Sequence, residues 1–175
     1  MNESYFINSF LRVIWRLQTC GFRRRQVRSP VSLMLYAGIR PNEVARLSWN
    51  DIDLAEKAIY ILPRHGKTGG ARRVTIHPPL LKILQKHYIS LDNILIWPPN
   101  WIKHWRSPRR SAGWEGNTPW RQDALRHTFA SYHLQYFRSY AELQLEIGRR
   151  DANLLRTSYL DMRGVKNADS FWKSS

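Results

Sequence analysis

The sequence is almost without cysteine: Cys20 is the only one among 175 residues. A single cysteine forbids an internal disulfide and cannot build a zinc site alone, which favours a reducing, cytoplasmic location. Long apolar runs are also missing, because no stretch approaches the roughly 20 residues that a membrane-spanning helix needs. The N-terminus likewise lacks the hydrophobic region of a secretory signal. These absences predict a soluble intracellular protein with no membrane partner.

Acidic residues are scarce beside basic ones. The chain has 13 Asp and Glu against 28 Lys and Arg, which gives a formal net charge of +15. For a chain this short, the excess indicates a polyanionic partner or an anionic surface. Disordered basic tails are poor in aromatic residues, whereas this chain has eight Trp and a hydrophobic content of 43%. We therefore expect one folded domain spanning residues 1–175.

Hydrophobic spacing predicts that most of this domain is helical. Apolar residues recur at helical intervals, and N-cap residues, prolines and glycines set the expected ends. A basic link of residues 21–25 is expected between the first two helices. The expected helices are Tyr5–Thr19, one that Ser29 and Pro30 open and Gly38 ends, a short one beginning at Arg40 and Pro41, one that Pro78 and Pro79 open, Ala124–Tyr136, Tyr140–Ile147, and one from Asp151 through Tyr159.

Strand signals are confined to one region. Ala58–Leu62 and Arg73–Ile76 have strand composition, and the glycine-rich residues 64–70 between them predict a hairpin. Residues 97–120 are rich in Pro, Trp and Gly and are expected to form a long loop. The predicted fold class is α+β, mostly α-helical with a small antiparallel sheet.

Three basic residues stand where a phosphate could bind. Arg40 precedes a helix N-terminus, where backbone N–H groups and a guanidinium can bind one phosphate together. Arg126 lies in the first turn of another expected helix, and Lys67 lies at the hairpin tip between glycines, which let the backbone approach a ligand closely. Taken singly, each is most simply a solvated surface charge.

The order of these segments changes that interpretation. AGIRPNEV at 37–44 is followed by GKTG at 66–69, LRHTFAS at 125–131 and TSY at 157–159. Over about residues 5–172, the chain strongly resembles the catalytic domain of tyrosine recombinases, the phage integrase family. The resemblance implies that catalytic-domain fold and a recombinase, encoded by a prokaryote, phage or mobile element. Such an enzyme cleaves and rejoins double-stranded DNA through a 3′-phosphotyrosine.

The resemblance also assigns catalytic roles. Arg40 and Arg126 match the arginines that hold the scissile phosphate, and Glu43 matches the acidic residue that follows the first of them. Lys67 matches the hairpin lysine that protonates the leaving 5′ oxygen, and Tyr159 matches the nucleophile. Physical chemistry supports this set, because preorganised donors on a phosphate each contribute roughly 10²–10³ in rate. The family uses neither metal nor ATP, so no cofactor is expected.

Two positions depart from the family pattern. Asp123 stands where the family usually has histidine, three residues before Arg126. A carboxylate beside a phosphate is unfavourable, and we expect Asp123 instead to cap its helix, which is worth about 1 kcal/mol. His127 is a possible substitute donor. Arg149 stands where the family has His or Trp; it is either a further phosphate donor or part of a solvated basic loop.

The resemblance carries two expectations about the ends of the chain. The N-terminal helical domain with which relatives grip the opposite face of DNA is expected to be absent. Phe171 and Trp172 resemble a C-terminal tail that in relatives docks on the same or a neighbouring protomer, which predicts self-association on DNA through this tail.

Two other functions remain open from the sequence. The first is a catalytically degenerate relative that only binds DNA, favoured by Asp123 and Arg149 but not by the retained Tyr159, arginines and Lys67. The second is a basic RNA-binding module, although the sequence lacks the strand aromatics of an RRM and a suitably placed Gly-x-x-Gly loop of KH domains.

Overall fold

The computed structural model describes residues 22–66, 70–88, 94–97, 106, 110, 123–148 and 168–173. The described part is mostly helical with one small antiparallel sheet, which confirms the predicted fold class. Its helices are α2 (Phe22–Tyr36), α3 (Pro41–Val44), α4 (Pro78–His87), α6 (Ala124–Phe137), α7 (Tyr140–Ile147) and α9 (Ala168–Lys173), and its 3₁₀ turns are η1 (Trp49–Asp51) and η2 (Pro63–His65). The expected helices 5–19 and 151–159 lie outside the described residues.

Helix α2 begins earlier than the sequence indicated. It starts at Phe22, so the expected basic link 21–25 lies largely within the helix and Pro30 is internal. Proline removes one backbone N–H from a helix interior. The residues after it, including Val31, Leu33 and Leu35, are completely buried. Burial of this apolar stretch keeps the helix continuous despite the proline.

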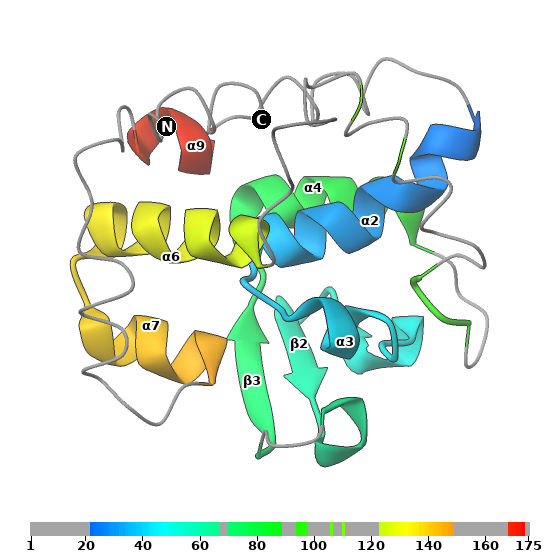
Figure 1. Cartoon of the computed structure of the whole chain (residues 1–175), viewed down its shortest axis with the longest axis horizontal. Coiled ribbons are helices and arrows are strands. Elements are labelled where there is room, and N and C mark those ends of the chain that lie inside the picture. Colours follow the sequence, from blue (N-terminus) through cyan, green and yellow to red (C-terminus); the bar gives the residue numbers. More distant parts are fainter. Residues whose placement is uncertain are drawn as a thin grey trace.

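The sheet consists of β1 (Ile52–Asp53), β2 (Ala58–Ile61) and β3 (Arg72–Thr75), in that spatial order. All pairs are antiparallel, and Ile59 of β2 lies opposite both Ile52 and Val74. Figure 1 shows the β2–β3 hairpin extending away from the layer of helices α2, α4 and α6, with α7 beside β3. Ile59, Ile61 and Val74 of this hairpin are buried in the core, and η2 directly follows β2.

The core forms where α2 packs against α4 and α6. Gly38 ends the α2 segment with a φ of +60°. A Cβ at this position would lie 2.4 Å from Cδ1 of Phe129 on α6, so only glycine permits this approach. This contact brings the segment before Arg40 against α6.

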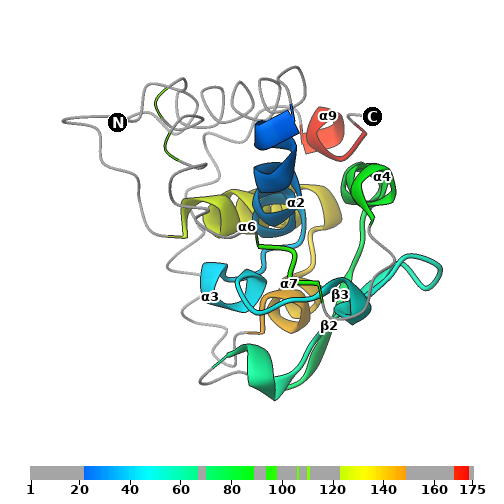
Figure 2. The same ribbon diagram turned by 90° about the vertical axis from the view of Figure 1, so that its right-hand side faces the viewer.

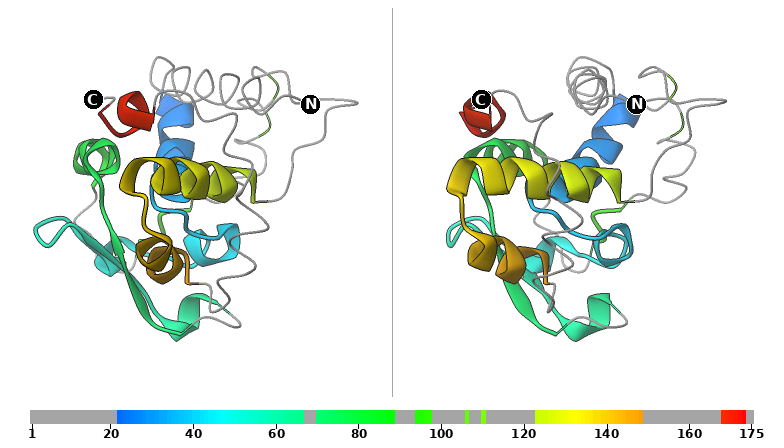
Figure 3. Two further views of the ribbon diagram at one scale, coloured as in Figure 1. Left: turned by 90° about the vertical axis from the view of Figure 1, so that its left-hand side faces the viewer. Right: turned by 60° about the vertical axis from the view of Figure 1, so that its left-hand side comes forward.

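Helix α9 covers the other side of the helical layer, next to α4 in Figures 2 and 3. Phe171 stacks on Tyr132 with ring centroids 4.2 Å apart, and Nε1 of Trp172 donates to the backbone oxygen of Tyr132 at 3.2 Å. The side chains of Phe171 and Trp172 are therefore buried against their own chain. Among the helices that the structure describes, none is long and apolar enough to cross a membrane.

Candidate active site

Arg40 and Glu43 are joined at the start of α3. Arg40 is the N-cap residue, and Pro41 occupies the first turn, where its fixed φ and missing N–H suit a helix start. The backbone N–H of Arg40 donates to Glu43 Oε2 at 3.0 Å, and Arg40 Nη1 donates to Oε1 at 3.2 Å. The Arg40 side chain is 33% exposed and that of Glu43 only 3%. A buried carboxylate thus holds a guanidinium that reaches the surface.

A third residue, Arg72 of β3, completes this group. Its Nη1 donates to Glu43 Oε1 at 2.9 Å and its Nη2 to Oε2 at 2.7 Å, which is the paired geometry that makes arginine–carboxylate contacts strong. The sequence analysis missed Arg72. The signal was its strand period: Arg72 and Val74 share the buried face, whereas Arg73 is exposed. We call Arg40, Glu43 and Arg72 the arginine–glutamate cluster.

Glu43 carries a negative charge at neutral pH. Burial raises the pKa of its carboxyl, but the hydrogen bonds and positive charges of Arg72 and Arg40 outweigh this, and the pKa lies below its usual range. One buried anion therefore stands between two permanently charged guanidiniums. The arginine–glutamate cluster keeps a net positive charge next to the exposed Arg40 side chain.

Arg126 fastens α6 to the same region. It is buried, in the first turn of α6, and its Nη1 donates to the backbone oxygen of Gly38 at 2.5 Å. Its Nη2 donates to the backbone oxygen of Ile147 at the end of α7 at 2.6 Å. Because Gly38 lies two residues before Arg40, these bonds bring the two predicted phosphate-binding arginines into one region.

Lys67 lies outside the described residues, but Gly66 directly before it is described. A Cβ at Gly66 would lie 3.6 Å from Oε1 of Glu43. The β2–β3 connection therefore lies beside the arginine–glutamate cluster. His65, in the turn before it, is buried; its Nδ1 accepts from the backbone N–H of Leu62 at 3.0 Å, which fixes this turn.

Arg149 and Tyr159 also lie outside the described residues. Gly148, directly before Arg149, ends α7 with a φ of +62°. A Cβ there would lie 2.9 Å from Cδ of Arg72. The backbone positions preceding Lys67 and Arg149 thus border the same cluster, from the hairpin and from the end of α7.

Asp123 does not cap α6 as the sequence predicted. It stands at the N-cap position, but its backbone is left-handed (φ 60°, ψ 14°) and its side chain makes no capping hydrogen bond. Capping side chains normally extend from a β-region backbone, which aims them at the N–H groups of the first turn. Only its backbone oxygen engages the helix, accepting from the N–H of His127 at 2.9 Å. His127 itself is half-buried.

Comparison with known proteins agrees with this architecture. The sequence model of the phage integrase family matches residues 11–96. A search of curated proteins by sequence finds no significant match.

Solved recombinase structures share the fold. The structure of XerA recombinase superposes with a TM-score of 0.68 at 22% identity and covers 87% of this chain and 58% of its own. XerH site-specific recombinase, bound to palindromic difH substrate after cleavage, gives a TM-score of 0.66 at 19% identity, covering 95% of this chain and 52% of its own.

A transposon integrase is similar as well. Residues 82–397 of the Tn1549 integrase, in complex with circular intermediate DNA, give a TM-score of 0.63 at 14% identity, covering 85% of this chain and 59% of the other. The chain thus spans little more than half of each of these solved chains. The resemblance to the phage integrase family is confirmed by the match at residues 11–96, and the chain has the fold of a tyrosine recombinase catalytic domain.

Proposed function

We propose that this chain is the catalytic domain of a site-specific DNA recombinase or integrase that cleaves and rejoins strands through a 3′-phosphotyrosine. One observation carries the proposal: Arg126 donates to Gly38, two residues before Arg40, so two arginines from distant segments occupy one region. The arginine–glutamate cluster holds Arg40 there with its side chain partly exposed. Such paired guanidiniums suit a phosphodiester, whose charge must be offset before a nucleophile can attack.

In the proposed reaction, the phenolic oxygen of Tyr159 attacks the scissile phosphorus. A bond forms between that oxygen and the 3′ phosphate, and the bond to the 5′ oxygen breaks. Lys67 gives its proton to the departing oxygen. Rejoining is the reverse step, in which a 5′ hydroxyl attacks the phosphotyrosine and the Tyr159 oxygen leaves. The phosphodiester energy is conserved in the covalent intermediate, so no ATP is consumed.

The arginines stabilise the charge that develops on the phosphate. Arg40 reaches it from the surface, and Arg126 contributes its charge from the buried side. Arg149 follows Gly148, which contacts Arg72, so it starts close to the same cluster and is proposed as a further donor. Lys67 follows Gly66 in the same way, and consecutive Cα atoms lie about 3.8 Å apart. Glu43 positions Arg40 rather than touching substrate.

Double-stranded DNA is the proposed partner. The net charge of +15 provides the electrostatic attraction, and two of the similar solved chains are DNA complexes. If the protein contacts six or more phosphates, raising the salt concentration from about 50 to 200 mM should lower its DNA affinity roughly 10³-fold. A binding constant that does not change with salt would contradict this partner.

Covalent trapping tests the enzymatic proposal. The chain is incubated with nicked duplexes of randomised sequence, from which the cleaved end diffuses away and leaves the protein attached to DNA. We expect a covalent adduct that withstands denaturation, maps to Tyr159 and disappears in Tyr159→Phe. The matched control is Tyr140→Phe, which changes an exposed tyrosine at the start of α7.

A catalytically degenerate DNA-binding protein is the second candidate function. Asp123 favours it, because this acidic residue stands three positions before Arg126 and makes no side-chain capping hydrogen bond that would give it a structural role. Arg149, at the position of a family histidine or tryptophan, favours it too. Salt-dependent duplex binding without any trapped adduct from the randomised pool would select this function.

Self-association on DNA through the C-terminal tail is a further part of the proposal. Helix α9 is held mainly by the side chains of Phe171 and Trp172, which pack on α4 and α6. A neighbouring protomer offers the same surface, so α9 could exchange between copies. We expect light scattering to show a multimer on DNA for the wild type and a monomer for Trp172→Ala; equal masses would contradict exchange.

A further inference from the structure

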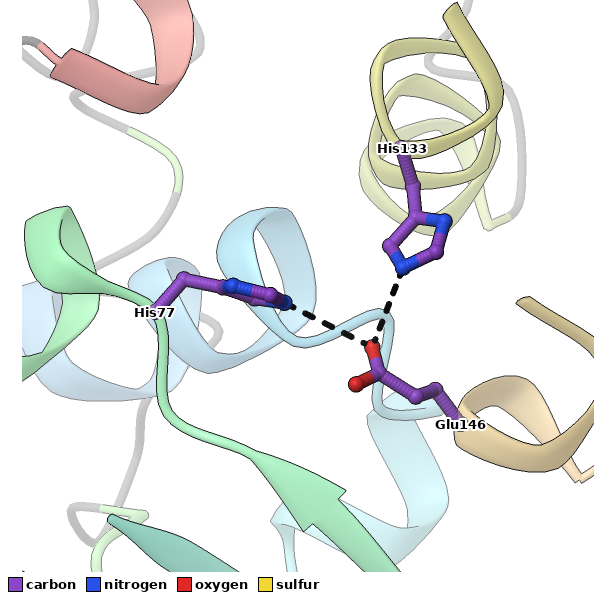
Figure 4. Close-up of side chains that lie close together, drawn as sticks. All are labelled: His77, His133 and Glu146. Carbon is purple, nitrogen blue, oxygen red and sulfur yellow. Dashed lines mark ion pairs between the residues drawn. The ribbon is translucent and has the colours of Figure 1, made fainter. Parts of the chain in front are cut away.

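Three potential metal ligands converge from separate elements. His77 stands directly before α4, His133 lies on α6, and Glu146 lies on α7. Figure 4 shows the three side chains pointing toward one another. Oε2 of Glu146 lies 3.7 Å from Nε2 of His77 and 3.7 Å from Nε2 of His133, and all three ligand atoms lie within 4.8 Å of one another. No other group of this kind occurs in the part of the chain that the structure describes.

The three side chains are largely buried, yet key atoms have no hydrogen-bond partner. Side-chain exposure is 12% for His77, 2% for His133 and 11% for Glu146. Nε2 of His77 and Oε2 of Glu146, the two atoms that face each other, lack any hydrogen bond. A buried polar atom left without a partner destabilises the fold. One cation between the three side chains would engage both of these atoms and Nε2 of His133.

The donor types suit metal binding. Two imidazoles and a carboxylate form a donor set that zinc uses, with a fourth position for water.

The distances fit a small ion. Zinc–ligand bonds of about 2.0–2.2 Å place tetrahedral ligand atoms about 3.3 Å apart. The two observed glutamate–histidine distances are a few tenths of an ångström longer. The two histidine nitrogens are separated by up to 4.8 Å, so the imidazoles must rotate toward each other when the ion binds. We propose that His77, His133 and Glu146 bind a divalent transition-metal ion of the zinc type, in a site that joins α4, α6 and α7.

Aromatic side chains cover one side of the proposed site. The His77 ring lies 4.6 Å from that of Trp172 and 5.1 Å from that of Phe137, centroid to centroid. This apolar cover keeps the ion away from bulk water, which strengthens its bonds. The backbone oxygen of Glu146 accepts from Arg72 Nε at 2.9 Å, so the ion would also steady the end of α7 beside the arginine–glutamate cluster.

The test uses the whole chain without a histidine tag, stripped with a chelator. Zn²⁺ is added during calorimetric titration, and Co²⁺ during visible spectroscopy. We expect one Zn²⁺ per chain, the intense visible absorption of tetrahedral Co²⁺, and a melting temperature that rises with Zn²⁺. If the wild type shows none of these responses, the three side chains form a metal-free polar cluster and the proposal is wrong. None of these readouts requires DNA cleavage, so the proposed function is tested separately.

Variants identify the ligands. Glu146→Gln and His77→Gln keep side-chain volume approximately but remove a ligand, and each should weaken Zn²⁺ binding at least 10-fold. The matched control is Glu142→Gln, one turn earlier on the exposed face of α7, which should bind as the wild type does. Circular dichroism confirms folding before titration. Equal weakening in the control, or unchanged binding in both ligand variants, would place the ion elsewhere and contradict the proposal.

Discussion

Two buried glutamates in this molecule have opposite surroundings. Glu43 is 3% exposed and accepts four hydrogen bonds, three from the guanidinium groups of Arg40 and Arg72 and one from the Arg40 backbone N–H. Glu146 is 11% exposed, and its Oε2 faces two imidazoles at 3.7 Å without accepting a hydrogen bond. Protein donors thus fill the hydrogen-bonding positions of the Glu43 carboxylate, whereas Oε2 of Glu146 is left able to bind a ligand.

The difference follows from the partners. A guanidinium is always charged and offers five donors in a planar fork that matches a carboxylate. An imidazole offers a single nitrogen on each side of its ring, and at 3.7 Å neither His77 nor His133 forms a hydrogen bond with Oε2 of Glu146. The arginine–glutamate cluster therefore fixes backbone segments, and the histidine–glutamate group is suited to hold an ion.

The largest effect should come from Glu43→Gln. The amide keeps the size of the side chain but leaves Arg72, whose side chain is 8% exposed, without a counter-charge. Removing one partner of a buried ion pair costs about 3–5 kcal/mol. Urea unfolding should show this loss. A loss below about 1 kcal/mol would mean that Glu43 and Glu146 are equivalent, and the comparison would fail.

Arg40→Ala should separate catalysis from stability in the same cluster. The Arg40 side chain is 33% exposed, so its loss should change the free energy of unfolding much less than Glu43→Gln does. Loss of a preorganised donor to the phosphate should lower the single-turnover cleavage rate roughly 10²–10³-fold. Arg138→Ala, which removes an exposed arginine at the end of α6, is the matched control. Equal rates for the two variants would remove Arg40 from the proposed site.

Acid should weaken the arginine–glutamate cluster in a defined direction. The pKa of Glu43 is lower in the folded protein than in the unfolded chain, so the carboxylate adds stability that is fully present above the unfolded value. This stability is lost as the pH falls through the folded pKa. Each unit of depression is worth about 1.4 kcal/mol. Unfolding curves measured across acid pH should converge for wild type and Glu43→Gln; a constant difference would contradict the assignment.

Local signals explain what could be read from the sequence. Helix α7 has the predicted bounds, Tyr140–Ile147, because Gly148 takes the left-handed conformation that ends helices. Helix α3 follows Arg40 because proline is suited to the first turn. The hairpin was predicted, but its second strand was placed at Arg73–Ile76, one residue later than the observed β3, Arg72–Thr75. Strand β1 has only two residues and gave no readable pattern.

Long-range contacts explain what could not be read. Pro30 looks like a helix start, and only burial of the residues after it makes it internal to α2. Asp123 is a residue type that often caps helices, but its backbone is left-handed and its side chain makes no capping hydrogen bond. His77, His133 and Glu146 meet through tertiary packing alone, because no sequence spacing links them. Arg72, by contrast, could have been found from the sequence. The alternation of strand residues places its side chain on the same face as the buried Val74.

The smallest effect should come from Glu146→Gln in chelator-treated protein. The 3.7 Å separations exceed hydrogen-bond length, so the amide sacrifices little direct bonding. The new NH₂ group can also donate to a neutral imidazole nitrogen, and no buried charge remains to be desolvated. Against this, the carboxylate has a lowered pKa, which means that the fold favours its charged form. Together, these effects should lower the free energy of unfolding by about 1 kcal/mol or less, well below the loss expected for Glu43→Gln in the same urea assay. Adding Zn²⁺ should then widen the gap between wild type and Glu146→Gln, because the wild type binds the ion more tightly and gains more stability from it. A loss of 3 kcal/mol or more without metal would show that Glu146 is already satisfied by the protein, and the contrast between the two glutamates would be wrong.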